Sequence, residues 1–334
     1  MLKRLRGGVS VATLAWAALF VNLIVILQGA VVRATGSGAG CGSHWPLCNG
    51  EVVPLAPSTE TLIEFSHRLL SLGALLMCGW LLLAAWRSRK ERPALWGAAL
   101  ASFVFIIFEA LLGAATVLLG LTGDNATVGR GLMVASHLVN SLLLVGALTT
   151  TLVYARNKTL GPPKLRKQGM LATVLGVGLV GMLVLSFSGG IAAMGNTMFP
   201  SQSLAEGLAA DFDASSHLLI RLRILHPLIA ITVGVYLFLS LGLSWWLKPV
   251  LEAKRLAQAL LGVYIVQLVI GSANLAFLAP TVLQLAHLFT AVLAFGLLAA
   301  LSVHALGSPA TVTNVSFNPR AEPHPEPYAK KAVR

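Results

Sequence analysis

The sequence predicts an all-α integral membrane protein with eight transmembrane helices. Its composition is the first observation: 56% of the 334 residues are hydrophobic and only 11% are charged, whereas about a quarter of the residues of a soluble domain are charged. The second observation is that the apolar residues form separate runs of about 20, the length with which a helix crosses the hydrocarbon core of a bilayer.

The apolar runs follow one another along the whole chain. We expect helices at residues 12–33, 62–86, 94–120, 131–154, 169–192, 219–246, 256–279 and 281–306. The first run follows Lys3, Arg4 and Arg6 as in a signal peptide, but it is too long and lacks a clear cleavage site, so we expect it to remain as a membrane helix. The polar, proline-containing segment 308–334 is expected to be a disordered cytoplasmic tail, because it cannot bury enough apolar surface to fold.

The net charge of +12 reflects membrane topology and does not indicate a nucleic-acid partner. Basic residues occur at the N-terminus and after every second apolar run, within 87–92, 156–167 and 248–255. Because lysine and arginine are enriched on the cytoplasmic side of membrane proteins, both termini are expected in the cytoplasm. No arginine- and serine-rich transit segment precedes the first run, so we expect a multi-pass protein of a bacterial plasma membrane.

The second half of the chain repeats the first. The aligned residues are Gly29 with Gly189, His67 with His226, Glu109 with Gln267, Gly113 with Gly271 and His137 with His287. This predicts two four-helix-bundle repeats, at 1–160 and 161–307. Since each unit has an even number of spans, both copies enter the membrane in the same orientation, as parallel repeats about an axis along the membrane normal.

Four histidines lie inside these runs, near the ends that are expected to face outward: His67, His137, His226 and His287. An ionisable side chain within a membrane span is costly and usually functional, and imidazole is a common ligand of haem iron. Each unit supplies one histidine from its second helix and one from its fourth, so they can face each other across a bundle. We therefore expect two haem sites; the alternative is that each histidine only bonds to a neighbouring helix.

Glu64 breaks the symmetry of the repeats. It lies three residues before His67, on the same helical face, whereas the corresponding position in the second unit holds Arg223. We expect Glu64 to be catalytic through proton exchange; the alternative is a structural ion pair with Arg68. Arg223 is expected to bind haem propionates, or else to extend to the membrane surface. Glu109, whose counterpart is uncharged, is a second candidate acid at the first site; the alternative is that it only bonds to a neighbouring helix.

The first outer loop contains Cys41 and Cys48 within a glycine-rich segment. On the oxidising side of a membrane this pair is expected to form a disulfide. We interpret it as a structural cross-link in preference to a redox-active pair. Cys78, inside the second apolar run, is expected to be inert core.

In combination, these motifs resemble the haem A synthase family, membrane enzymes that convert haem O to haem A for terminal oxidases. The resemblance covers about residues 10–306. Its motifs are Arg33-Ala-Thr-Gly-Ser-Gly, Cys41 to Gly50 with His-Trp-Pro-Leu inside, Glu64-Phe-Ser-His67-Arg68, Gly113-Ala-Ala-Thr116, Ser136-His137-Leu138, Leu225-His226-Pro227 and Ala286-His287.

The resemblance implies that the substrate, haem O, lies near His67 and His137, while His226 and His287 bind the cofactor, haem b, through its iron. It also implies that Glu64 is essential. The implied reaction oxidises a porphyrin methyl group to a formyl group by successive hydroxylations, and electrons leave through haem b.

The resemblance also suggests partners. These are a haem O synthase, a thiol–disulfide protein, an electron acceptor, membrane lipid and further copies of the chain. One departure from the family is that residues 193–217 contain no cysteine, whereas some bacterial members carry a second pair there. The Cys41 and Cys48 pair is therefore left as the contact for a thiol protein.

Two other functions use the same four ligands. A di-haem b-type electron-transfer subunit would change neither porphyrin, and an acid beside only one site argues against it. A haem transporter or chaperone is expected to have a tryptophan-rich outer segment, whereas the first outer loop has only Trp45.

Overall fold

The computed structural model describes residues 9–163, 168–247 and 250–309. Its eight long helices are α1 (Val11–Ala34), α2 (Thr59–Trp86), α3 (Pro93–Leu118), α4 (Val128–Arg156), α5 (Gly169–Met198), α8 (Leu225–Leu247), α9 (Leu251–Ala276) and α10 (Thr281–Leu306). The shorter elements are η1 (Ser37–Ala39), α6 (Leu204–Phe212), α7 (Leu218–Arg221), β1 (Leu160–Pro163) and β2 (Gly307–Pro309). Eight spans long and apolar enough to cross a membrane are present in these ranges, which confirms the predicted number.

Polar residues mark where several helices begin. The side chains of Ser10, Ser58 and Thr127 accept hydrogen bonds from backbone N–H groups in the first turns of α1, α2 and α4. Such caps satisfy donors that have no partner within the helix. α3 begins at Pro93, a position where proline loses no hydrogen bond.

The sixth span is interrupted, which corrects the continuous helix expected over 219–246. A turn at residues 222–224 separates α7 from α8. Pro227 accounts for this break. In a continuous helix its ring would collide with the carbonyl group four residues earlier, that of Arg223.

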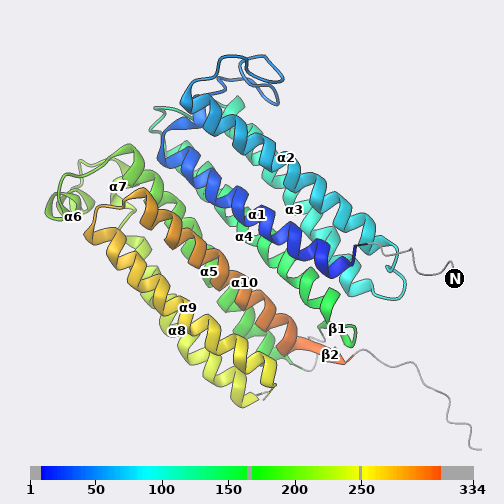
Figure 1. Ribbon diagram of the computed structural model, residues 1–334. Coiled ribbons are helices and arrows are strands. Elements are labelled where there is room, and N and C mark those ends of the chain that lie inside the picture. Colours follow the sequence, from blue (N-terminus) through cyan, green and yellow to red (C-terminus); the bar gives the residue numbers. More distant parts are fainter. Residues whose placement is uncertain (1–8, 164–167, 248–249, 310–334) are drawn as a thin grey trace, which may run out of the picture.

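The long helices form two groups of four (Figure 1). In the first group α1 contacts α2 and α4, and α3 lies between α2 and α4; in the second, α5 contacts α8 and α10, and α9 lies between α8 and α10. The groups pack together through α4, which touches α5 and α10, and through α1, which touches α10. α4 and α10 are accordingly the most buried spans. In their most apolar stretches 56% of the residues are buried, compared with 28% or less in the other spans.

A close approach of two helices joins the groups. At Gly190 of α5, an added Cβ would lie 2.7 Å from the Cα of Ala135 on α4. Glycine therefore allows these backbones to touch. Membrane helices commonly pack through such small residues, because close backbone approach replaces the hydrophobic driving force available in water.

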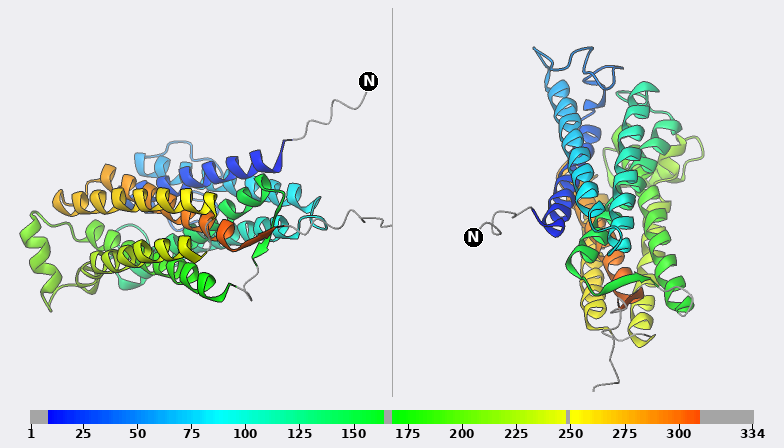
Figure 2. Two further views of the ribbon diagram at one scale, coloured as in Figure 1. Left: turned by 90° about the horizontal axis from the view of Figure 1, so that it is seen from below. Right: turned by 90° about the vertical axis from the view of Figure 1, so that its right-hand side faces the viewer.

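The two ends of the molecule differ (Figures 1 and 2). One end carries the loop between α1 and α2 and the helices α6 and α7; we call it the histidine end. The other, the strand end, carries the start of α1 and the antiparallel pair β1–β2, two short strands that the sequence did not predict. Both described chain ends therefore lie together, although the side of the membrane on which they lie stays a prediction. Of the tail expected at 308–334, only 308 and 309 lie within the described residues.

Candidate functional site

The structure brings the four predicted histidines together as two pairs, one in each helix group. His67 of α2 and His137 of α4 lie near each other in the first group. The rings of His226 and His287, from α8 and α10, are 6.2 Å apart between centroids and nearly perpendicular. All four side chains are partly buried inside their bundles.

Each histidine packs against a glycine on a neighbouring helix. The four contacts are Gly29 with His67, Gly113 with His137, Gly189 with His226 and Gly271 with His287. An added Cβ would lie 3.2, 3.9, 3.0 and 3.0 Å, respectively, from the nearest imidazole atom. The repeat alignment had paired these glycines with one another but had assigned them no role. The structure shows that they make space for the imidazoles.

A polar side chain from the third helix of each group lies beside one histidine. Glu109 Oε1 is 3.4 Å from His137 Nε2, and Gln267 Nε2 is 3.1 Å from His287 Nε2. Glu109 also accepts hydrogen bonds from Asn140 and Ser141. Glu109 and Gln267, which the sequence alignment had paired, therefore lie in equivalent places in the two groups. One site has a carboxylate beside its histidine and the other has an amide.

The hydroxyl group of Ser188 contacts the second pair from α5, with its oxygen 3.1 Å from His226 Nδ1. Within the described chain, the Nδ1 atoms of His67 and His287 are buried and have no hydrogen-bond partner. A hydrogen-bond partner such as the Ser188 hydroxyl orients an imidazole that binds a metal. The sequence reasoning did not identify Ser188, although the serine directly precedes Gly189.

Glu64 is buried and its carboxylate is shared between α2 and the first outer loop. Oε1 accepts hydrogen bonds from Arg68 Nη2 at 2.5 Å and from Nε at 3.2 Å. Oε2 accepts one from the backbone N–H of Cys41 at 2.8 Å. The ion pair considered as the alternative to catalysis is thus present. A carboxylate held in place in this way also suits a catalytic site.

The first outer loop is fastened to α2. The predicted Cys41–Cys48 disulfide is formed. Arg68 also donates hydrogen bonds to the carbonyl groups of His44 and Leu47, at 2.8 and 2.7 Å. Arg68 therefore joins the disulfide loop to Glu64. Cys78 is a buried free thiol, as expected for core.

Arg223 occupies a different setting from Glu64. It lies in the turn before α8, so the helical register that places Glu64 and His67 on one face does not apply to Arg223 and His226. Its guanidinium bonds to Asp211 of α6 at 2.8 Å and to Asn196 of α5 at 2.9 Å. These contacts hold α6 against the bundle and match the arginine charge with a carboxylate.

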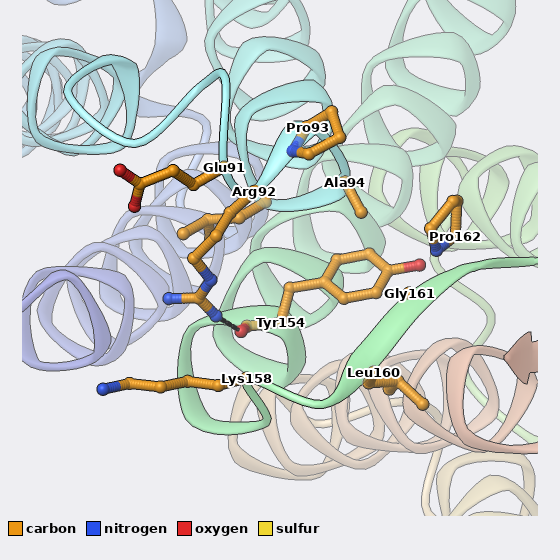
Figure 3. A pocket seen from close by; sticks show the side chains of 10 residues that line it. Glu91, Arg92, Pro93, Ala94, Tyr154, Lys158, Leu160, Gly161 and Pro162 are labelled. Atoms are coloured by element: carbon orange, nitrogen blue, oxygen red, sulfur yellow. Dashed lines mark hydrogen bonds between the residues drawn. The ribbon is translucent and has the colours of Figure 1, made fainter. Parts of the chain in front are cut away.

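A pocket lies at the strand end, away from the histidines (Figure 3). In it, Arg92 donates a hydrogen bond to the carbonyl group of Tyr154. The lining residues are Glu91, Arg92, Pro93, Ala94, Leu95, Tyr154, Lys158, Leu160, Gly161 and Pro162. It includes none of the predicted site residues.

The histidine pairs fit haem better than a bare ion. In the described ranges, no three side chains of the types that bind metals gather as one cluster. A haem iron needs only axial ligands from the protein. Each pair supplies two imidazoles that pack against glycine. One imidazole of each pair, that of His67 or His287, also has a buried Nδ1 atom with no hydrogen-bond partner among the described residues. These features fit the axial ligands of a haem iron.

These features define an α-helical protein with eight membrane spans and two histidine pairs within its core. The chain belongs to the COX15-CtaA family of cytochrome oxidase assembly proteins, whose family profile matches residues 12–299. The resemblance to haem A synthases that the motifs indicated is thereby confirmed.

Individual relatives share substantial identity with the chain. It is 46% identical over 278 residues to a protohaem IX farnesyltransferase of Thermus thermophilus, covering 83% of the chain and 45% of that protein. It is 38% identical over 157 residues to the haem A synthase of Halalkalibacterium halodurans, covering 46% of the chain and 50% of the relative. For the haem A synthase of Alkalihalophilus pseudofirmus, the identity is 48% over 100 residues, or 29% of the chain and 33% of the relative. The chain thus spans half or less of each relative.

Proposed function

We propose that the protein is a haem A synthase, which oxidises a methyl group of haem O to a formyl group by successive hydroxylations. The observation that carries the proposal is the presence of two separate histidine pairs with unlike polar neighbours. The first pair, His67 and His137, binds haem O as substrate. The second, His226 and His287, binds haem b. The family membership supports this assignment.

The polar neighbours suit different tasks at the two pairs. Haem b at the second pair would accept and pass on single electrons. Gln267 and Ser188 place neutral groups beside its ligands and orient the imidazoles. At the first pair, Glu109 orients His137. We assign Glu64 to proton transfer and to stabilising positive charge that develops during oxidation of the substrate.

The Thermus thermophilus relative supports a link to the preceding reaction. It bears the name of a farnesyltransferase acting on protohaem, and the chain matches only 45% of its length. We propose that a farnesyltransferase supplies the substrate and works beside this protein in a bacterial plasma membrane. An electron acceptor, a thiol–disulfide protein that meets the Cys41–Cys48 pair, and self-association complete the proposed partners.

The function is tested by the pigments of the purified protein. We expect haem b together with haem O or haem A, and formation of haem A when a haem O synthase is co-expressed. The measurement is chromatography of extracted porphyrins with mass spectrometry. Haem b alone at both pairs would favour an electron-transfer subunit. Unchanged haem passed to a second protein would favour a transporter.

Gly189→Ala tests the histidine assignment without touching a ligand. The added Cβ would lie 3.0 Å from His226, so the imidazole must shift, and overpacking of this kind costs about 1–3 kcal/mol. We expect roughly tenfold weaker retention of haem b, measured by titration of the Soret band. Gly176→Ala on the same helix has nothing within 4 Å of its added Cβ and should retain haem normally. Equal behaviour of the two variants would contradict the assignment.

A further inference from the structure

Arg33 connects the two helix groups. Its side chain leaves the end of α1 and donates hydrogen bonds to the carbonyl oxygen of Ala193 at 3.1 Å, to Thr197 Oγ1 at 2.5 Å and to Gln284 Oε1 at 2.6 Å. These acceptors belong to α5 and α10, and all of them are neutral. A guanidinium group has five N–H donors, so the three bonds leave two donors for another ligand.

The contacts of Arg33 lie next to the second histidine pair. Gln284 is three residues, about one helical turn, before His287 on α10. Ala193 is four residues after Gly189, the glycine that packs against His226. The guanidinium therefore lies about one turn closer to the histidine end than these imidazoles. The first helix group supplies it, whereas the second group surrounds it.

A second arginine adds positive charge at the same contact between the two helix groups. Arg130 of α4 is close enough to act on the charge of Arg33. The N–H groups of Arg130 donate to two loop carbonyl groups and to the sulfur of Met198. The carboxylate of Asp124 is near Arg130 but does not form an ion pair with it. Among the described residues, no carboxylate oxygen lies within 4.0 Å of either guanidinium.

Two other arginines at the histidine end each have an acidic partner. Arg68 pairs with Glu64 at 2.5 Å and Arg223 pairs with Asp211 at 2.8 Å. Arg33 is partly buried, and its hydrogen-bond partners among the described residues are all neutral. Burial of a charge without a counter-ion costs free energy. This setting therefore favours binding of an anion.

We propose that Arg33 binds a carboxylate side chain of the porphyrin held by His226 and His287. The inference rests on the part of the proposed function that places haem at this pair. A guanidinium forms strong, charge-assisted hydrogen bonds with carboxylates. Three of the five N–H donors of Arg33 are used within the protein, so two remain for such a ligand. Arg33 is then a residue of the first group that helps the second group retain its cofactor. It takes the role that the sequence had suggested for Arg223.

The test compares haem b with its dimethyl ester, in which both carboxylates are blocked. The full-length protein is purified without haem, and the dissociation constant of each pigment is measured from the Soret band. We expect the wild-type protein to bind the free acid about tenfold or more tightly than the ester. Arg33→Met should lose most of this preference, and Arg33→Lys should keep part of it. The readout is the ratio of the two dissociation constants within one variant. A general weakening of the contact between the helix groups would change both constants alike and leave the ratio unchanged.

The controls separate the competing explanations. Arg89→Met, which alters an exposed arginine at the strand end, should keep the preference. Loss of the preference in Arg223→Met but not in Arg33→Met would overturn the proposal in favour of Arg223. If the wild-type protein shows no preference and Arg33→Met instead loses bound phospholipid in native mass spectrometry, Arg33 binds a lipid phosphate and the proposal is wrong. If haem binds with the expected preference but no haem A forms, the proposed function fails while this inference stands; if no haem binds, both fail.

Discussion

Replacing His226 with alanine should remove haem b from the purified protein while the first histidine pair keeps its ligand. The expectation follows from the packing, because His226 and His287 belong to α8 and α10, whereas His67 and His137 belong to α2 and α4. Loss of outer-shell partners of metal ligands alone weakens binding by about 10–100-fold. We therefore expect loss of an axial ligand to weaken haem b retention by more than about a hundredfold, measured from pyridine haemochrome spectra.

The matched control is His304→Ala on α10, the helix that also carries His287. His304 lies near the strand end, far along the helix from the pair, so its replacement should leave haem b in place. His67→Ala should show the converse pattern and lose haem O before haem b. If His226→Ala empties both pairs equally, or keeps haem b, the assignment of one haem to each helix group is wrong.

Replacing Glu64 with glutamine should abolish most haem A formation in a protein that still folds and keeps haem b. Glutamine preserves the shape of the side chain but carries no negative charge and does not accept a proton. General acid–base and electrostatic contributions each change rates by about a hundredfold or more. We therefore expect haem A output to fall by roughly a hundredfold, measured by chromatography against the amount of bound haem O.

Because Glu64 also holds Arg68 and the amide of Cys41, its structural role needs a separate control. Arg68→Gln breaks the same ion pair but leaves the carboxylate. If Glu64 acts in chemistry, Arg68→Gln retains far more activity than Glu64→Gln. Equal losses in both variants would reduce Glu64 to an anchor of the loop. Near-normal output from Glu64→Gln with loss in Glu109→Gln would move the acidic role to Glu109, which lies beside His137.

Much of the architecture was predictable because transfer of apolar side chains from water to lipid acts on each segment by itself. The eight spans follow from run length alone, and the observed helices begin and end within a few residues of most expected ones. The break before α8 was missed, although Pro227 signalled it. The histidine pairs were predicted from the alignment of the two halves of the sequence, on the expectation that a duplicated bundle places equivalent residues at equivalent points.

The contacts of the charged side chains could not be predicted in this way. The sequence by itself determined the membrane class, the eight spans, the paired histidines and the two cysteines that form the disulfide. Only the tertiary structure decided that Glu64 bonds to Cys41, that Glu109 approaches His137 and that Arg33 crosses to the second helix group. The physical reason is range. Hydrophobic burial depends on each segment's own composition, whereas an ion pair or hydrogen bond forms only between atoms about 3–4 Å apart, and those separations exist only once distant helices have packed.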